Sequence, residues 1–134
     1  MKIPNFNCKI EMYCAINPSE DSEKIQKSIS NIFPYSKIKI ENSSIFAESK
    51  DLNSLEKIYE AVHSKQSQKT FRRNMQKNLR NDSTWFYLNK QAAFVEKIAI
   101  CEESEESPLG PIKVIFTSSK IDEIIDWFVY GDEN

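Results

Sequence analysis

Residues 7–16, NCKIEMYCAI, alternate apolar and polar side chains with a period of two. This period is typical of a β-strand with one buried face, because successive side chains of a strand point to opposite sides of the sheet. Cys8 and Cys14 share the parity of the apolar residues, so we expect both thiols to be buried as small hydrophobic groups. The segment therefore predicts a half-buried strand near the start of the chain.

A helix pattern follows this strand. Residues 17–20, Asn-Pro-Ser-Glu, supply an N-cap side chain, a proline suited to the first helical position and a carboxylate for the first turn. Pro34 disfavours helical geometry in the residue before it, so the helix should end near Phe33. The apolar residues between these limits recur at helical spacing: Ile25, Ile29, Ile32 and Phe33.

The remaining strand candidates are segments rich in β-forming residues, at 37–41, 44–49, 84–89, 93–101 and 112–117. The first two are separated only by Asn42-Ser43, which predicts a hairpin. Two further helical patterns lie before and after the last three strand candidates. One begins around Asp51 and continues to residue 80, either as one bent helix or as two helices that meet at residues 63–67, and the last ends near Gly131.

These elements follow the order β-α-β-β-α(α)-β-β-β-α. Strands and helices alternate, but hairpin-like connections dominate, which favours an α+β fold. We expect a mostly antiparallel sheet of about six strands with helices packed on one face. No repeat or linker divides the sequence, so residues 1–134 are predicted to form a single domain.

Composition narrows the classes of protein further. No apolar run approaches the roughly 20 residues that cross a bilayer, and the amino-terminal segment lacks the pattern of a secretory signal, which predicts a cytoplasmic protein. The three cysteines, Cys8, Cys14 and Cys101, form an odd set without C-x-x-C spacing, which indicates neither a disulfide framework nor a four-ligand zinc site.

Motifs for catalysis are scarce. With two glycines, Gly110 and Gly131, the sequence has no P-loop and no dinucleotide-binding turn, because both motifs need several glycines. The only histidine, His63, has no partner for a catalytic triad and is expected to cover a helix end. Asp122 and Asp126 lie one helical turn apart, and paired carboxylates of this kind keep a metal-dependent hydrolase as a hypothesis. We predict a protein that is not an enzyme and needs no cofactor.

The basic segment at residues 61–81 is the strongest functional signal. It contains no acidic residue and six basic ones, including all three arginines of the chain: Lys65, Lys69, Arg72, Arg73, Lys77 and Arg80. The whole chain has 18 basic and 20 acidic side chains, so 12 basic side chains face 20 acidic ones elsewhere. On an ideal helix with Met75 at zero, the six cations span roughly 60° to 200°, a single flank beside the apolar line. Guanidinium and ammonium groups in such a row suit a phosphate backbone.

Neighbouring side chains could extend this basic ridge, defined as residues 65–80. Its amides, such as Gln76 and Asn78, suit sugar or base edges. Trp85, Phe86 and Tyr87 lie on a predicted strand, so at least one of them could be exposed as a stacking platform for an unpaired base, with core packing as the alternative. Lys90 follows this strand and could add a cation to the same surface.

An acidic connection precedes the last predicted strand, with Glu102, Glu103, Glu105 and Glu106. It is either a solvated loop or a segment that contacts the basic ridge, of the same or another chain, and competes with nucleic acid. We expect an RNA-binding module that contacts phosphates through the basic ridge. The alternative is a protein-interaction or self-assembly module in which the ridge docks on an acidic surface.

Several motifs resemble an archaeal group, uncharacterised protein family number two hundred and one, which is labelled RNA-binding. They are residues 86–97, FYLNKQAAFVEK, residues 106–114, ESPLGPIKV, and Asp126-Trp127, joined by residues 31–34, residues 52–55 and Arg72-Arg73 in the front half. The resemblance therefore covers nearly the whole chain.

This resemblance implies a fold similar to the large-subunit ribosomal protein that binds 5S ribosomal RNA, and structured or ribosomal RNA as a partner. It is also compatible with a homodimer. It supplies no catalytic residues. One departure is Glu96, where the family pattern FVGK has glycine, so a kink in this segment should be weaker here.

Overall fold

Six antiparallel strands form one sheet in the computed structural model of this chain, which describes residues 1–103, 106 and 109–131. The strands are β1 Lys9–Ala15, β2 Lys37–Glu41, β3 Ser44–Ser49, β4 Ser83–Leu88, β5 Ile100–Cys101 and β6 Ile112–Thr117. Their spatial order is β2-β3-β1-β6-β4-β5, so β1 and β6 lie in the middle. This is the predicted α+β arrangement.

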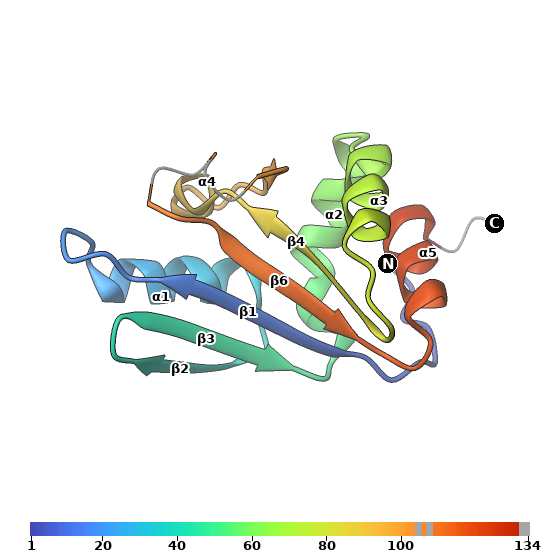
Figure 1. The fold of residues 1–134 in the computed structure, drawn as a ribbon, viewed down its shortest axis with the longest axis horizontal. Helices are drawn as coiled ribbons and strands as arrows, with labels where there is room; N and C mark the ends of the chain where they lie inside the picture. The colour runs from blue at the N-terminus through green and yellow to red at the C-terminus, as the bar shows by residue number, and fades with distance from the viewer. Residues whose placement is uncertain (104–105, 107–108, 132–134) are drawn as a thin grey trace.

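The helices pack on one face and along one edge of this sheet (Figure 1). They are α1 Ser22–Ile32, α2 Glu56–Ser64, α3 Gln68–Lys77, α4 Lys90–Phe94 and α5 Ile121–Tyr130, and a 3₁₀ turn, η1 Leu52–Leu55, leads into α2. In Figure 1, α1 and α2 lie behind the sheet, and α3 lies beside β4. None of the described helices combines the length and the apolar character that a bilayer crossing needs.

Burial alternates along the central strands as the sequence predicts. In β1, Ile10 and Met12 are inaccessible and face the helices, whereas Tyr13 is exposed on the other side. Met12 lies opposite Ala47 of β3 and Val114 of β6, both also buried. The sheet therefore has a core face and an open face, and the open face comprises the odd-numbered residues of β1, β4 and β6.

An aromatic cluster fills the core between the sheet and its helices. Phe86 of β4 and Phe116 of β6 contact Phe128 of α5, with ring centroids 5.8 and 5.2 Å from that of Phe128. Phe71 of α3 joins them at 5.2 Å from Phe86. These rings tie the basic segment to the centre of the fold.

The three cysteines are buried, as predicted for Cys8 and Cys14. Burial raises the pKa of the Cys8 thiol to about 12 and that of the Cys14 thiol to about 11. Burial also raises the pKa of Cys101. A thiol that stays protonated is a poor nucleophile and a poor metal ligand, so these side chains act as packing groups.

The structure corrects two predictions about individual elements and decides between two alternatives for a third segment. The first helix is capped by Asp21, whose carboxylate accepts the Glu23 N–H, and not by Asn17. The strand predicted at residues 93–101 is reduced to β5, Ile100–Cys101, because the Asn89 side chain accepts the Ala92 N–H and caps helix α4. Residues 51–80 contain two helices that meet, not one bent helix.

Glu96 ends α4 in the left-handed conformation, with φ of 59°. Its N–H bonds the Ala93 carbonyl, and the Lys97 N–H bonds the Ala92 carbonyl. This pair of hydrogen bonds is a helix-ending motif whose left-handed residue is usually glycine. At this position of the FVGK pattern the glutamate therefore adopts a conformation that glycine usually supplies.

Replacing Glu96 with glycine should stabilise the fold by about 0.5 to 1 kcal/mol, because glycine adopts positive φ without a Cβ clash. Urea unfolding followed by circular dichroism measures this difference. Glu96→Ala is the matched control, since it removes the charge and keeps the Cβ. Equal gains in the two variants would mean that charge, and not backbone strain, is relieved.

Candidate nucleic-acid interface

Helix α3 carries most of the basic ridge and is anchored by its apolar side. Phe71 and Met75 are buried, and the Thr84 hydroxyl of β4 donates to the Met75 carbonyl at 2.5 Å. The Asn78 amide, at the C-cap, donates to the Trp85 carbonyl at 2.9 Å. These contacts hold α3 along the β4 edge of the sheet and fix which of its sides faces solvent.

A break separates α3 from α2 and moves Lys65 off the ridge helix. Gln66 adopts a positive φ of 54°, and the Ser67 N–H bonds the Val62 carbonyl to close the end of α2. Lys65 is the C-cap residue of α2, and its ammonium donates to the Ile98 carbonyl at 3.2 Å. The single ideal helix assumed for residues 65–80 is therefore wrong outside residues 68–77.

The cations of the segment are nevertheless all exposed. Four of them lie on α3, namely Lys69, Arg72, Arg73 and Lys77, whereas Lys65 precedes the helix and Arg80 follows it. The four on α3 occupy one flank, because the opposite side of the helix is committed to the core. A solvent-facing row of cations is thus present on one short helix.

Arg72 of this row and Arg80, which follows the helix, are oriented by neutral partners. The Arg72 guanidinium lies over the Tyr130 ring of α5, 5.4 Å from its centroid. The Arg80 guanidinium donates to the carbonyls of Lys77 and Leu79, at 3.3 and 2.8 Å. Neither contact neutralises the positive charge, so both groups can still attract a phosphate.

Two cations on α3, Arg73 and Lys77, pair with the acidic connection. Arg73 forms an ion pair with Glu102, and Lys77 lies 3.8 Å from Glu103. The Arg73 and Lys77 side chains stay 63% and 60% exposed, so both pairs are open to water. The hydrogen bond and charge of Arg73 lower the pKa of Glu102. The acidic connection therefore contacts the ridge of its own chain; Glu105 lies outside the described residues.

The amides of the ridge are divided between solvent and the protein. Asn74 is buried and its side chain donates to the Thr70 carbonyl, and Asn78 is used by Trp85. These two are bound within the fold, whereas Gln66 and Gln76 are exposed. Fewer amides than predicted are therefore free to contact the sugar or base edges of a nucleic acid.

The prediction that Lys90 extends the basic surface is wrong, because its side chain is completely buried. Its ammonium lies 3.0 Å from the Glu20 carboxylate, and it donates to the carbonyls of Ala15 and Leu109 at 2.8 and 2.7 Å. Lys90 is the first residue of α4, and its side chain reaches the end of β1, the turn before α1 and the segment before β6. It ties three segments together and is not available to a ligand.

Glu20 has a role that its sequence position conceals. Residues 17–20 read as the start of a helix, but the Asn17 backbone and side-chain N–H groups both donate to the Glu20 carboxylate, at 2.9 and 2.8 Å. The helix begins one turn later, and Glu20 turns inward to Lys90. A charged residue at a predicted helix start is normally solvated, so no local pattern announces this pair.

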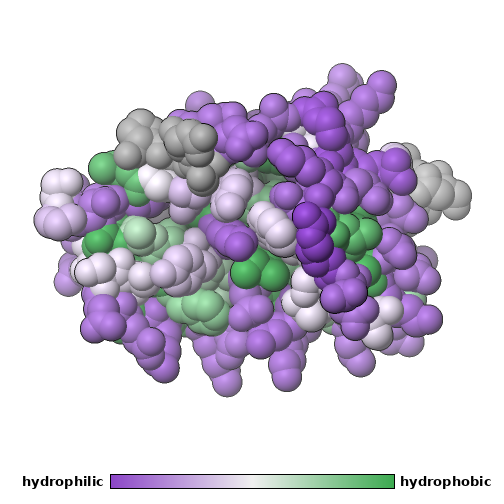
Figure 2. Space-filling model, in the orientation of Figure 1, coloured by the Kyte–Doolittle hydropathy of each residue, from purple (hydrophilic) through white to green (hydrophobic). Residues whose placement is uncertain are grey.

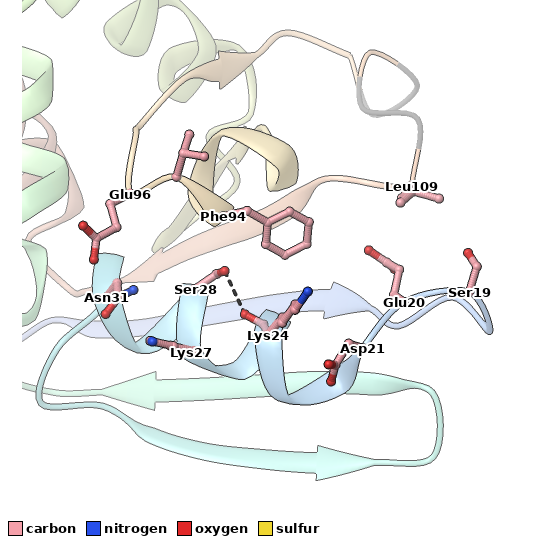
Figure 3. A pocket seen from close by; sticks show the side chains of 11 residues that line it. Ser19, Glu20, Asp21, Lys24, Lys27, Ser28, Asn31, Phe94, Glu96 and Leu109 are labelled. Atoms are coloured by element: carbon pink, nitrogen blue, oxygen red, sulfur yellow. Dashed lines mark hydrogen bonds between the residues drawn. The ribbon is translucent and has the colours of Figure 1, made fainter.

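A hollow of about 660 Å³ lies between α1 and α4, next to Glu20 (Figure 3). Lys24, Lys27 and Asn31 line one side of it, and Phe94 and Glu96 line the other. Its charged groups have both signs, in contrast to the flank of α3.

The remaining candidates for chemistry lie apart from one another. His63 stacks on Tyr59, and its Nε2–H donates to the Phe128 carbonyl at 2.9 Å, so it joins α2 to α5. Asp122 and Asp126 are exposed on α5. Across residues 1–103, 106 and 109–131, no three His, Cys, Asp or Glu side chains are grouped closely enough to hold a metal ion.

Comparison with known proteins places this geometry in a family. A family model described as RNA binding matches residues 9–118, which run from the start of β1 to the residue after β6. A UPF0201 protein of Methanothermobacter thermautotrophicus is 35% identical over 119 residues, which cover 89% of each chain. One from Sulfurisphaera tokodaii is 37% identical over 123 residues, covering 89% of this chain and 85% of the relative.

Solved structures agree with these sequence matches. The 2.2 Å crystal structure of a UPF0201 protein from Methanococcus jannaschii has a TM-score of 0.77 and 28% identity, covering 90% of this chain and 92% of that one. The chain belongs to the UPF0201 family, as its motifs suggest. Membership supports RNA as a partner, and none of the names of these relatives denotes an enzyme. The likeness to the 5S-binding ribosomal protein stays a prediction.

The Glu20–Lys90 pair gives a prediction for stability. Burial raises the pKa of Glu20, but hydrogen bonds from Asn17 and Lys90 outweigh burial and hold it below its usual 4.5. Glu20→Gln should lower the free energy of unfolding by about 3 kcal/mol at neutral pH, because it leaves the Lys90 charge buried without its partner.

The pH dependence has a definite sign. Since the folded-state pKa is the lower one, the contribution of Glu20 is complete above about pH 4.5 and is lost as the pH falls through the folded-state value. Urea unfolding at a series of pH values should show this loss in the parent protein and a flatter profile in Glu20→Gln. Glu23→Gln, on the exposed side of α1, is the control. Equal stabilities of the two variants at neutral pH would contradict this role.

Proposed function

We propose that this protein binds RNA through the basic flank of α3, without catalysing a reaction on it. Lys69, Arg72, Arg73 and Lys77 would contact the phosphates, and Lys65 and Arg80 would extend the contact beyond the two ends of the helix. The observation that carries the proposal is a solvent-facing row of cations in a stretch of 21 residues, 61–81, that contains no acidic side chain.

The dimensions of the flank suit a short stretch of one nucleic-acid strand. From Lys69 to Lys77 the helix rises about 12 Å, a length over which one nucleic-acid strand presents several phosphates. Two arginines on this flank offer planar forks that bind phosphate oxygens in pairs. The family model described as RNA binding favours RNA over other polyanions.

The self-assembly alternative has less support. It requires the acidic connection of one chain to pair with the ridge of another, whereas Glu102 and Glu103 already pair with Arg73 and Lys77 within the chain. An exchange of equivalent exposed ion pairs gains little free energy.

Removing the three guanidinium groups tests the proposal. Arg72→Gln, Arg73→Gln and Arg80→Gln together should weaken binding to a single-stranded RNA oligonucleotide by about 2 to 4 kcal/mol, because each arginine makes charge-assisted hydrogen bonds. The slope of log affinity against log salt should become less steep by about 2, since each of the three lost phosphate contacts accounts for about 0.7 of it. Fluorescence anisotropy over a range of salt concentrations measures both quantities.

A matched control separates this site from a general loss of charge. Lys24→Gln, Lys27→Gln and Lys50→Gln remove three exposed cations far from α3 in sequence and should leave most of the affinity intact. Thermal unfolding checks that both triple variants fold. Equal losses in the two variants, or a flat salt response of the parent protein, would count against the basic flank.

The acidic connection gives a second prediction. Glu102→Gln with Glu103→Gln should tighten RNA binding by about two- to tenfold, because it frees Arg73 and Lys77 from exposed ion pairs of modest strength. The same anisotropy assay at low salt measures the gain, which should shrink as salt rises. Glu23→Gln with Glu56→Gln, two exposed acids on α1 and α2, is the control. Unchanged affinity in the first variant would show that these pairs do not compete with RNA.

A further inference from the structure

The open face of the sheet carries aromatic side chains that the core does not use. Tyr13 of β1, Lys113 of β6 and Tyr87 of β4 lie side by side across three adjacent strands. Trp85 is the next residue of β4 on this face, two positions before Tyr87, and it lies opposite Ile115 of β6. Trp85 and Tyr87 are partly exposed and Tyr13 is 45% exposed, although strand alternation buries Phe86 between them.

A cation occupies the face of the only indole on this side. The Lys113 ammonium lies 4.7 Å from the centroid of the Trp85 ring. Trp127, the other tryptophan, is 6% exposed, and its ring N–H donates to the Lys2 carbonyl on the helical side. Trp85 is therefore the indole that a ligand can reach, and Lys113 covers the surface on which a flat ring would stack.

The charges of the open face leave Lys113 available. Two of the carboxylates on this face, those of Glu11 and Glu41, pair with Lys9 and Lys39 at 3.8 and 2.6 Å. Within the described residues Lys113 forms no ion pair, so its attraction to an anion is not cancelled by a bonded carboxylate. An aromatic ring with an unpaired ammonium beside it complements a nucleotide, which has a flat base and a phosphate.

We propose that Trp85 stacks an unpaired base of the RNA strand that binds α3, and that Lys113 moves from the indole to the neighbouring phosphate. Tyr13, on the next strand but one, offers a second ring to the following bases. The inference rests on the proposed function and adds to it a ligand class, single-stranded RNA, and a second contact surface.

The exchange at Trp85 is favourable in principle. A cation over an exposed aromatic ring is held weakly, whereas a stacked base contacts the whole ring, and the displaced ammonium gains a phosphate. The stacking tolerates any base, because every base has a flat π-face. A site of this kind distinguishes single strands from duplexes, whose bases are already stacked on one another.

The two surfaces are continuous. Asn78, the residue that caps α3, donates to the backbone carbonyl of Trp85, so the end of the basic flank and the indole share one short stretch of the molecule. Figure 2 shows the open face toward the viewer, with pale and green side chains over the middle of the sheet and strongly hydrophilic ones over α3 beside them. One strand of RNA could contact both without a sharp turn.

The test compares two probes that differ only in their bases. One is an oligouridylate of about ten nucleotides, a length within the usual range for single-strand sites, and the other is the same sugar-phosphate backbone without bases. The full-length protein should bind the oligouridylate about five- to fiftyfold more tightly, because only this probe can stack. It should also quench the Trp85 emission, whereas the backbone probe should not.

Variants assign the difference to the proposed residues. Trp85→Leu keeps an apolar side chain on the strand and should bind both probes almost equally, whereas Trp85→Phe should keep part of the preference. Lys113→Gln should weaken the binding of both probes and reduce the slope of log affinity against log salt by about 0.7. Lys39→Gln, a lysine on the same face at its far edge, should change neither. Thermal unfolding establishes that each variant folds.

The outcomes separate the two proposals. If the parent protein binds both probes equally and Trp85 emission does not change, the stacking site is wrong, while the arginine variants still decide the role of α3. Retention of the full preference in Trp85→Leu would also overturn it. Failure to bind either probe would overturn both proposals, and a loss confined to the arginine variants with no base preference would leave only the first.

Discussion

The structure depends on the burial of one face of a six-stranded sheet. The inward side chains of β1, β4 and β6 form the core with the helices, and Phe128 of α5 joins the rings of Phe86 and Phe116. Because strand side chains alternate, every residue buried on this face places its neighbours on the other. The aromatic and basic groups of the open face are thus a consequence of how the core is made.

The same core determines how the basic segment is presented. Phe71 and Met75 hold α3 against β4, and this orientation turns its cations to solvent. The acidic connection after β5 approaches the same flank and pairs with two of the cations. The net charge of the surface is therefore lower than residues 61–81 alone indicate. RNA would have to compete with carboxylates that are already in place, and the strength of binding should depend on salt through both sets of contacts.

Much of the fold was predictable because its patterns are local. The alternation in residues 7–16, the hairpin at Asn42-Ser43 and the apolar spacing of the helices are visible in short windows of sequence. The wrong predictions concern segments whose structure is decided by a side chain outside the local pattern, or by a side chain that has two possible partners. Asn89 caps a helix in a segment rich in strand formers.

The candidate site divides in the same way. The exposure of the four cations on α3 follows from the helical spacing of the apolar side chains between them. Their partners do not: Tyr130 and Glu102 are 58 and 29 positions from the arginines that they contact. Lys113 and Trp85 are brought together only by the pairing of β4 with β6.

The sequence by itself determined most of the strands and helices, with α4 as the exception, together with their buried sides and the concentration of positive charge in one segment. These follow from side-chain periodicity and composition, which act over a few residues. Only the tertiary structure decided that Lys90 is buried against Glu20, that α3 lies beside β4, and that acidic residues reach the ridge. Those outcomes depend on contacts between distant segments, because an ion pair or a ring contact forms only after the chain has brought both groups to the same place.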